Sequence, residues 1–207
     1  MAFFVFAGNV FLDKYYPMQR DLLLHDFFSK YAELEKEQFD AMFRHFQFMK
    51  CHKHQLFLRA GERNANFYFV CSGLVRMFVA SPKDEVTTWL ATEGTPAFEV
   101  YSFLSGQPSI CYLEALEDVE LLFISKAQLD DLFLKFPVLN VVFRKIWEET
   151  LVVGIPIFHA MQNSTAEERY LKLASNKALL QRVPLKYLAS FIGVTPSTLS
   201  RIRARIK

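Results

Sequence analysis

Two short amphipathic segments, separated by a glycine, lie near the C-terminal end of the chain at residues 185–206. The first segment has apolar residues at i, i+3, i+4 and i+7, the spacing of one helical face: Leu185, Leu188, Ala189 and Ile192. Gly193 is free to take the left-handed conformation that ends a helix. Thr195 followed by Pro196 is typical of a new helix start. The pattern predicts two helices joined by a tight turn, in which the small Ala189 lets the second helix cross closely over the first.

The second segment has one apolar face, with Leu199, Ile202 and Ile206, and one polar and basic face. At about 100° per residue, the side away from Leu199 carries Ser197, Arg201, Ala204 and Arg205, with Thr198 and Ser200 on the flanks. Arg203 falls only about 40° from Leu199, so it is a weaker candidate for a base contact. A helix pair with a short glycine turn is the motif that reads DNA in the major groove. The predicted DNA-binding residues are Ser197, Thr198, Ser200, Arg201, Arg203, Arg205 and Lys186.

Charge is distributed unevenly along the chain. Residues 165–207 carry nine lysines and arginines against two acidic residues, a net charge of +7, whereas residues 1–164 carry fifteen basic and twenty acidic residues, a net charge of −5. A basic lobe is the electrostatic signature of a partner with a phosphate backbone. A plain helical hairpin with a solvated basic surface is the alternative, and the coincidence with the helix pair favours double-stranded DNA.

The three cysteines, Cys51, Cys71 and Cys111, lie far apart and fit neither a metal spacing nor a disulfide framework. Each lies in or beside an apolar run, so we expect buried, reduced thiols in a cytoplasmic protein. Iron–sulfur sensing is disfavoured because it needs about four thiolates. His52 and His54 alternate along an expected strand and form a conceivable metal pair, but surface histidines are the preferred interpretation. No cofactor and no metal is expected.

Residues 1–17 are hydrophobic but too short to span a membrane as a helix, and they lack the features of a signal peptide. A packed strand or helix and an extension upstream of Met18 both remain open, and no function is assigned. No membrane partner is expected.

Residues 18–46 have the charged and apolar faces of one helix. Four β-rich runs follow, at residues 48–62, 64–82, 85–98 and 112–125, each bounded by turn-forming residues. Residues 126–136 return to helical spacing. Together they predict a compact antiparallel barrel or roll.

The pattern of residues 138–162 predicts one long helix that is apolar on more than one side. Such a helix must bury one face against the roll and another against a second apolar surface. Pro156 removes a helical N–H and is expected to kink or break it. Thr165 and Glu168 then fit a capping box for a further helix, with Tyr170, Leu171, Leu173 and Ala174 inward. The stretch before Pro184, which suits a first helical position, looks helical too.

Part of the roll region resembles cyclic-nucleotide-binding domains: Gly61, the run from Phe67 to Arg76, and Gly106-Gln107-Pro108-Ser109 followed by Glu114 to Asp118. With the helix-turn-helix behind it, the chain from about residue 18 to 207 resembles Crp/Fnr-type transcription regulators. The resemblance implies an α+β protein: an N-terminal antiparallel β-roll (double-stranded β-helix), a long dimerisation helix and a C-terminal all-α helix-turn-helix domain. It also implies a homodimer, double-stranded DNA and RNA polymerase as partners, and a small-molecule effector. The β-hairpin wing common in the family is expected to be lost or reduced.

The implied division is an N-terminal extension (1–17), a sensor domain (18–136), a dimerisation helix (137–163) and a DNA-binding domain (164–207).

The effector loop departs from the family pattern. Cyclic-nucleotide sensors of this type use an arginine to pair with the phosphate, and that position falls on or near Ser109 here. No lysine or arginine occurs between Asp84 and Ser125, so a phosphate would lack its counter-charge. A vestigial pocket or one for a neutral or apolar ligand is expected instead, lined by Phe98, Glu99, Tyr101, Ser109 and Tyr112, with Phe103 and Leu104 nearby.

Three readings therefore compete. The preferred one is a sequence-specific DNA-binding regulator that is not controlled by a cyclic nucleotide. The alternatives are a cyclic-nucleotide-responsive activator and a ligand-binding module that acts on a protein partner. An enzyme is not expected, since the sequence has no nucleophile–base set, phosphate loop or metal motif.

Overall fold

The computed structural model describes residues 20–82, 84–97 and 99–206. Residues 1–17 and Phe98, for which the sequence raised expectations, lie outside these ranges. The elements follow one another as α1 (Arg20–Ser29), α2 (Lys36–Phe43), β1 (Gln47–Cys51), β2 (Leu56–Leu58), β3 (Asn66–Ser72), β4 (Val75–Ala80), β5 (Glu85–Ala91), β6 (Thr95–Pro96), α3 (Val100–Ser105), β7 (Tyr112–Ala115), β8 (Val119–Ser125), α4 (Lys126–Lys135), α5 (Pro137–Asn163), α6 (Ala166–Ala174), α7 (Lys177–Arg182), α8 (Leu185–Phe191) and α9 (Pro196–Ile206).

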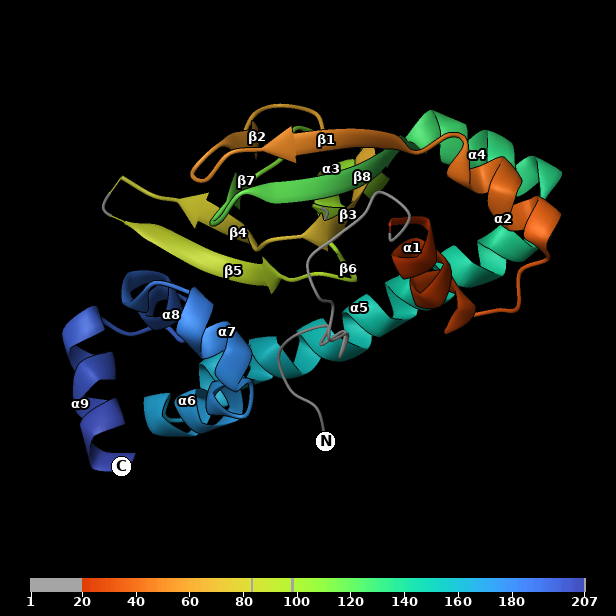
Figure 1. Cartoon of the computed structure of the whole chain (residues 1–207). Helices are drawn as coiled ribbons and strands as arrows, with labels where there is room; N and C mark the ends of the chain where they lie inside the picture. The colour runs from red at the N-terminus through yellow and green to blue at the C-terminus, as the bar shows by residue number, and fades with distance from the viewer. Residues whose placement is uncertain (1–19, 83, 98, 207) are drawn as a thin grey trace.

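The strands β1 to β8 form a roll of two four-stranded sheets (Figure 1). The first sheet has the order β1-β8-β3-β6 and the second the order β2-β7-β4-β5. All the neighbouring strands in both sheets are antiparallel. Each β-rich run of the sequence yields two strands, so the predicted antiparallel roll is confirmed.

Alternation along β3 gives the roll its inner and outer surfaces. Tyr68 and Val70 point into the space between the two sheets, whereas Phe67, Phe69 and Cys71 join a different core on the outside. A strand that is buried on both faces reads as a continuous apolar run, which explains why residues 67–71 contain no charge.

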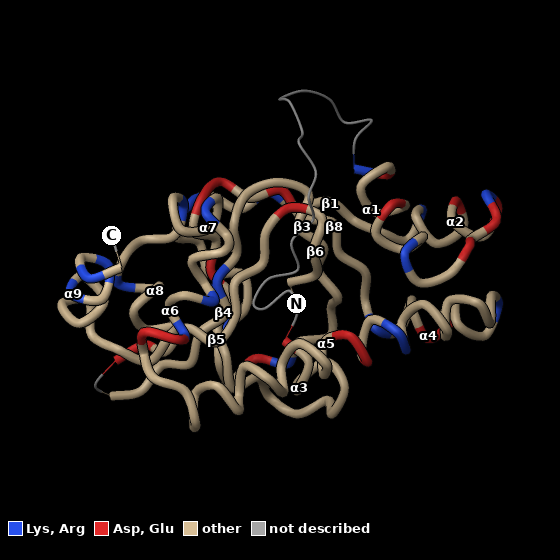
Figure 2. The backbone as a smooth tube through the Cα atoms, turned by 90° about the horizontal axis from the view of Figure 1, so that it is seen from below, with Lys and Arg blue, Asp and Glu red and all other residues tan. Residues whose placement is uncertain are grey.

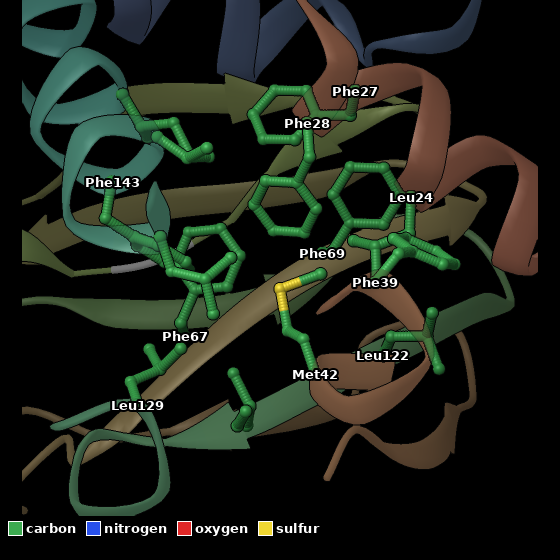
Figure 3. Close-up of a cluster of buried hydrophobic side chains, with 14 of the residues drawn as sticks. Leu24, Phe27, Phe28, Phe39, Met42, Phe67, Phe69, Leu122, Leu129 and Phe143 are labelled. Carbon is green, nitrogen blue, oxygen red and sulfur yellow. The ribbon is translucent and has the colours of Figure 1, made fainter. Parts of the chain in front are cut away.

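The outer face of the first sheet is covered by an aromatic core. Figure 3 shows Phe27 and Phe28 of α1 meeting Phe67 and Phe69 of β3 and Phe143 of α5. Phe67 and Phe143 meet edge to face, with ring centroids 5.3 Å apart. The first half of α5 is thereby fixed to the roll.

Residues 18–46 do not form one helix as predicted. The chain leaves the helical path after Ser29 and starts α2 at Lys36, where Glu35 and Gln38 form a capping box. The backbone carbonyl of Tyr31 accepts a hydrogen bond of 2.6 Å from Lys145 Nζ of α5. A side chain from a distant helix thus holds the backbone between the two helices.

The predicted long helix is present as α5, but Pro156 does not break it. The helix continues to Asn163 through the proline. The proline leaves the Val152 carbonyl without its usual intrahelical donor, but the helix remains continuous on both sides of it. None of the helices in the described part of the chain has the length and apolar character needed to cross a bilayer.

Helices α6 to α9 form a C-terminal head, defined here as residues 164–206 (Figure 1). The predicted capping box is present, since Thr165 Oγ1 accepts from the Glu168 N–H and the Glu168 carboxylate accepts from the Thr165 N–H. Tyr170 and Leu173 are buried as predicted, whereas Leu171 is exposed, contrary to the prediction. Within the described residues the head contains no strand, and the short α7 occupies the place expected for a wing.

The head is packed directly against the second sheet of the roll. Leu74, Leu90 and Leu116 of the roll belong to the same apolar cluster as Leu188 and Leu199 of the head. The head and the outer face of this sheet therefore share one core.

Candidate nucleic-acid interface

The turn between α8 and α9 has the predicted geometry. Gly193 has φ +71°, and the Val194 N–H donates to the Ala189 carbonyl at 2.9 Å. A Cβ added to Gly193 would lie 2.7 Å from Cε of Met161 on α5. The left-handed φ favours glycine at this position, whereas the Cε of Met161 is the end of a flexible side chain that can move aside.

The start of α9 is capped as the sequence predicts. The Thr198 N–H donates to Thr195 Oγ1 at 3.2 Å, and the Leu199 N–H donates to the Thr195 carbonyl at 3.0 Å. Pro196 opens α9. Pro184, by contrast, occupies the cap position of α8 and not its first helical position.

The outward face of α9 carries the polar and basic side chains expected from helical spacing. Ser197, Ser200, Arg201 and Arg205 are exposed, and Thr198 is half-buried. Arg201 donates from Nη2 to Thr198 Oγ1 at 3.2 Å. Figure 2 shows the basic residues of α9 at the end of the molecule opposite to α4. The arrangement offers hydroxyls and a guanidinium on one solvent-facing helix surface.

Two other predicted contact residues differ in their surroundings. Lys186 on α8 is exposed, with Nζ 4.4 Å from the centre of the Tyr187 ring. Arg203 is half-buried, and its guanidinium carbon lies 5.7 Å from the centre of the Tyr170 ring. Its Nε is buried without a hydrogen-bond partner. Arg203 thus faces the interior of the head, as its angular position relative to Leu199 indicated.

Helix α8 is fastened to β5 by hydrogen bonds as well as by apolar contacts. The Thr87 N–H donates to Ser190 Oγ at 2.7 Å, and Ser190 Oγ donates to the Glu85 carbonyl at 3.0 Å. One serine of the head therefore bonds two backbone groups of β5, the edge strand that follows β4 in the order of the described sheet.

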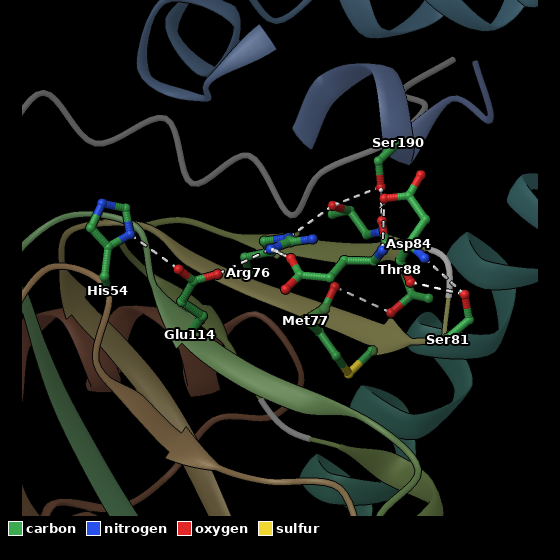
Figure 4. Close-up of polar contacts among 10 residues, drawn as sticks. His54, Arg76, Met77, Ser81, Asp84, Thr88, Glu114 and Ser190 are labelled. Atoms are coloured by element: carbon green, nitrogen blue, oxygen red, sulfur yellow. Dashed lines mark hydrogen bonds and ion pairs between the residues drawn. The ribbon is translucent and has the colours of Figure 1, made fainter. Parts of the chain in front are cut away.

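Beneath this contact lies a fully buried arginine (Figure 4). Arg76 on β4 donates to Thr87 Oγ1 at 2.9 Å, to Glu85 at 2.8 Å and to Glu114 at 3.1 Å. Tyr187 of the head covers its guanidinium, whose Nη2 has no hydrogen-bond partner. Paired carboxylates and a ring face thus compensate the cost of burying this charge.

A second cluster of charges links α7 to the roll. Arg182 forms two hydrogen bonds with each of Glu93 and Glu117, at distances between 2.6 and 3.0 Å. Burial acts to raise the pKa of Glu93, but the hydrogen bonds and charge of Arg182 and the Gly73 N–H outweigh it and lower the pKa. Arg182, one of the nine basic residues of the C-terminal segment, is therefore engaged with acidic residues of the roll.

The expected effector residues are occupied by internal hydrogen bonds. Glu99 is buried and caps α3, accepting from the Tyr101 and Ser102 N–H groups at 2.8 Å each. Ser109 is buried, and its hydroxyl donates to the Cys111 carbonyl at 2.9 Å and accepts from the Cys111 N–H at 3.1 Å. Neither side chain has an uncompensated polar group to offer a ligand.

The aromatic residues expected to line the same pocket lie elsewhere. Tyr101 and Leu104 are 48% and 53% exposed on α3, and Phe103 is buried in the core around α5. Tyr112 stacks on Phe78 with ring centroids 4.9 Å apart, on the face of the second sheet that also carries Arg76. The structure keeps Glu99 and Ser109 close to Cys111 but does not bring Tyr101 or Tyr112 into one pocket with them.

All three cysteines are free and buried, as predicted. Burial raises the thiol pKa of Cys51, that of Cys71 to about 12 and that of Cys111 to about 11, where the charge of Glu99 adds to the effect. Such thiols stay protonated at neutral pH and are poor nucleophiles and metal ligands.

His52 and His54 do not alternate on a strand as supposed. They lie in the turn between β1 and β2, where His54 has φ +68°. His54 Nδ1 lies 3.1 Å from Glu114 Oε1, whereas the Nδ1 of His52 lies 3.7 Å from Asp118. No group of three metal-ligating side chains occurs among the described residues.

The sequence reasoning missed the contact between the roll and the head. The sequence places Arg76 in an apolar strand but does not reveal its partners, although a charged residue in such a strand is itself a signal of a buried partner. Arg182 lies 89 residues from Glu93 and 65 residues from Glu117, so no local pattern connects them.

Comparison with known proteins agrees with this architecture. Residues 48–136 match the family model described as the cyclic nucleotide-binding domain. Among curated proteins, no sequence matches the chain.

Several solved structures share the fold over most of the chain. The c-di-GMP responsive global regulator CLP of Xanthomonas campestris has a TM-score of 0.67 at 16% identity, over 83% of this chain and 91% of that one. A CooA mutant from Carboxydothermus hydrogenoformans has a TM-score of 0.65 at 16% identity, over 79% and 77%. FixK2 from Bradyrhizobium japonicum has a TM-score of 0.63 at 17% identity, over 78% and 84%. The chain therefore contains a cyclic nucleotide-binding domain and has the fold of Crp/Fnr-type transcription regulators.

Proposed function

We propose that this protein is a homodimeric, sequence-specific DNA-binding transcription regulator of the cytoplasm, and that a cyclic nucleotide does not control it. The observation that carries the proposal is the outward face of α9, where Ser197, Ser200, Arg201 and Arg205 are exposed behind a capped glycine turn. The +7 net charge of residues 165–207 supports a polyanionic partner.

Each exposed residue of this face has a proposed role. Arg201 is the candidate for a guanine contact, because a guanidinium matches the O6 and N7 acceptors of that base. Ser197, Thr198 and Ser200 contact bases or phosphates, and Arg205 and Lys186 neutralise phosphates. We leave Arg203 out of the contact set because it is half-buried against Tyr170.

The second half of α5 supports the proposed dimer. Leu151, Val152, Ile155 and Phe158 are between 53% and 70% exposed. Such a row of apolar side chains on one long helix is suited to pairing with the same helix of a second copy. Two-fold symmetry would then place the two α9 helices in major grooves about 34–36 Å apart.

We propose three functional parts: a sensor domain at residues 18–136, a dimerisation helix at residues 137–163 and the DNA-binding head. The proposal that the sensor does not take a cyclic nucleotide rests on Ser109 and Glu99. Ser109 stands where the phosphate-pairing arginine is expected, and both side chains are hydrogen-bonded within the protein. Free cysteines are consistent with a reducing compartment.

The test is selection of bound sequences from a random duplex library, followed by titration of the selected palindrome and of random duplex. Arg201→Ala should reduce the ratio of specific to random affinity by about tenfold or more, in line with about 1–3 kcal/mol for a bidentate base contact. Lys186→Ala should weaken both duplexes by the same factor. Arg144→Ala, an exposed arginine of α5 paired with Glu148, is the matched control and should change neither affinity.

An equal loss on both duplexes for Arg201→Ala would refute its role in base reading. Calorimetry with cyclic AMP and cyclic GMP should give no binding heat. Saturable binding of either nucleotide, together with a higher affinity for the palindrome in its presence, would instead establish the cyclic-nucleotide-responsive activator.

A further inference from the structure

We propose that Arg169 fixes the angle between α5 and the head, and thereby sets the spacing of DNA half-sites that the dimer accepts. The inference deepens the proposed function and rests on it. Arg169 is a positioning residue in this account, because it acts on α9 through the backbone of neighbouring helices.

The side chain of Arg169 joins three segments of backbone. Its Nε donates to the carbonyl of Ile192, which caps the C-terminus of α8, at 2.8 Å. Its Nη1 donates to the carbonyl of Ser164, directly after α5, and lies 3.5 Å from that of Ala160 in the last turn of α5. One guanidinium on α6 thus connects the end of the long helix to the turn that precedes α9.

The chemistry of the acceptors suits an arginine. Carbonyls at the C-terminal end of a helix carry partial negative charge and favour a cation. Hydrogen bonds from a guanidinium to such carbonyls are charge-assisted, and the rigid fork of donors fixes directions as well as distances. A lysine keeps the charge but replaces the planar fork by a single flexible ammonium.

An independent contact occurs at the same place. Cε of Met161 in α5 would lie 2.7 Å from a Cβ at Gly193 and Nη2 of Arg169 would lie 3.8 Å from it. The last turn of α5 therefore touches the helix-turn-helix turn itself. The absence of a side chain at Gly193 leaves room for the end of the Met161 side chain.

The geometry has a consequence for a dimer. If two α5 helices pair, each α9 follows its own α5 through Arg169, Ile192 and the turn at Gly193. A rotation of the head about this point moves the distal end of α9 farther than the atoms at the pivot. In this proposal the precision of half-site spacing depends on Arg169 in addition to the contacts between the head and the roll, whereas base preference depends on the outward face of α9.

The first experiment measures affinity for duplexes whose half-sites are moved together or apart by one and two base pairs, and for a single half-site. The wild type should lose at least about tenfold in affinity when the spacing changes by one base pair. Arg169→Lys should bind the single half-site within about threefold of wild type and should discriminate less than about threefold among the spacings. Arg144→Lys, on α5 but outside this cluster, should keep the full discrimination.

Two results would overturn the proposal. The first is an Arg169→Lys variant that retains the wild-type spacing preference. The second is a variant that loses affinity for the half-site and for every spacing equally, as a merely structural role requires. Absence of DNA binding by the wild type would refute the proposed function instead, and a second measurement keeps the positioning role testable in that case.

The second experiment needs neither DNA nor a dimer. Spin labels are placed on α5 and α9 with Glu148→Cys and Ser200→Cys, and labelled chains are diluted with unlabelled ones. The native thiols are buried. The distance distribution between the labels should be narrow with Arg169 and at least about twice as wide with Arg169→Lys. Equal widths would contradict the positioning role.

Discussion

The guanidinium carbon of Arg76 in the roll lies 3.8 Å from the centre of the Tyr187 ring in the head. Arg76 is 0% exposed, and Tyr187 is 6% exposed. A charge in one part of the protein is thus shielded from water by an aromatic ring from the other part. The two parts are coupled, because moving the head away would expose the arginine and leave the ring without its partner.

Replacement of Tyr187 tests this coupling. Tyr187→Ala should lower the free energy of unfolding by about 3 kcal/mol, since it removes a buried ring and uncovers Arg76. Tyr187→Phe, which keeps the ring, should cost less than about 1 kcal/mol. Urea unfolding followed by circular dichroism measures both, and an alanine variant as stable as the phenylalanine variant would rule out a role for the ring.

The ion pairs of Arg182 should make stability depend on pH. The folded-state pKa of Glu93 is lowered, so its contribution is present above the unfolded pKa, near about 4.3. It is lost as the pH falls through the lower folded value. The unfolding free energy of wild type should therefore fall more steeply below about pH 4.5 than that of Arg182→Gln. Arg20→Gln, which loosens the separate pair with Glu120, serves as a comparison. Parallel curves for wild type and Arg182→Gln would contradict the assignment.

Two glycines with nearly the same φ provide a matched pair. Gly73 and Gly61 have φ +91° and +90°, but a Cβ at Gly73 would lie 2.5 Å from the Asp118 carbonyl oxygen, whereas nothing lies within 4 Å at Gly61. Gly61→Ala should cost about 1 kcal/mol from backbone strain alone. Gly73→Ala should cost at least about 1 kcal/mol more, because of the added clash. Equal losses of unfolding free energy would show that the backbone at Gly73 and the Asp118 carbonyl move apart at no cost.

The exposed row on α5 predicts the oligomeric state. Phe158→Glu should convert the dimer to a monomer in sedimentation velocity while leaving the circular dichroism spectrum unchanged, because a carboxylate would be buried in an apolar contact. Leu134→Glu on α4 is the control, since Leu134 is 84% exposed and outside this row. A Phe158→Glu variant that stays dimeric would remove α5 as the pairing surface.

Local patterns in the sequence predicted most elements of the fold. Helical spacing and capping residues predicted α8, α9 and the turn at Gly193, and alternation of apolar runs predicted the strands. These features depend on residues that are close in sequence. The break between α1 and α2 did not follow from pattern, because Lys145 holds the Tyr31 carbonyl from 114 residues away.

The features of the candidate site also divide into those that follow from local sequence pattern and those that depend on contacts between distant segments. The exposed face of α9 and the inward position of Arg203 followed from angular position on one helix. The contact of the head with β5 and the role of Arg169 depend on how separate helices and strands meet in space. The expected effector residues were dispersed because Glu99 caps α3 and Tyr112 lies on the outer face of its strand.

The measurement that tests the central claim most directly is the salt dependence of duplex binding by the intact protein. If the Lys186 and Arg205 residues of two heads neutralise four phosphates, affinity for the selected palindrome should fall about a hundredfold between 50 and 200 mM salt. The logarithm of the affinity should fall linearly with the logarithm of salt concentration. The account would be contradicted if the protein did not bind duplex DNA at 50 mM salt, or if its affinity for duplex DNA did not change with salt concentration.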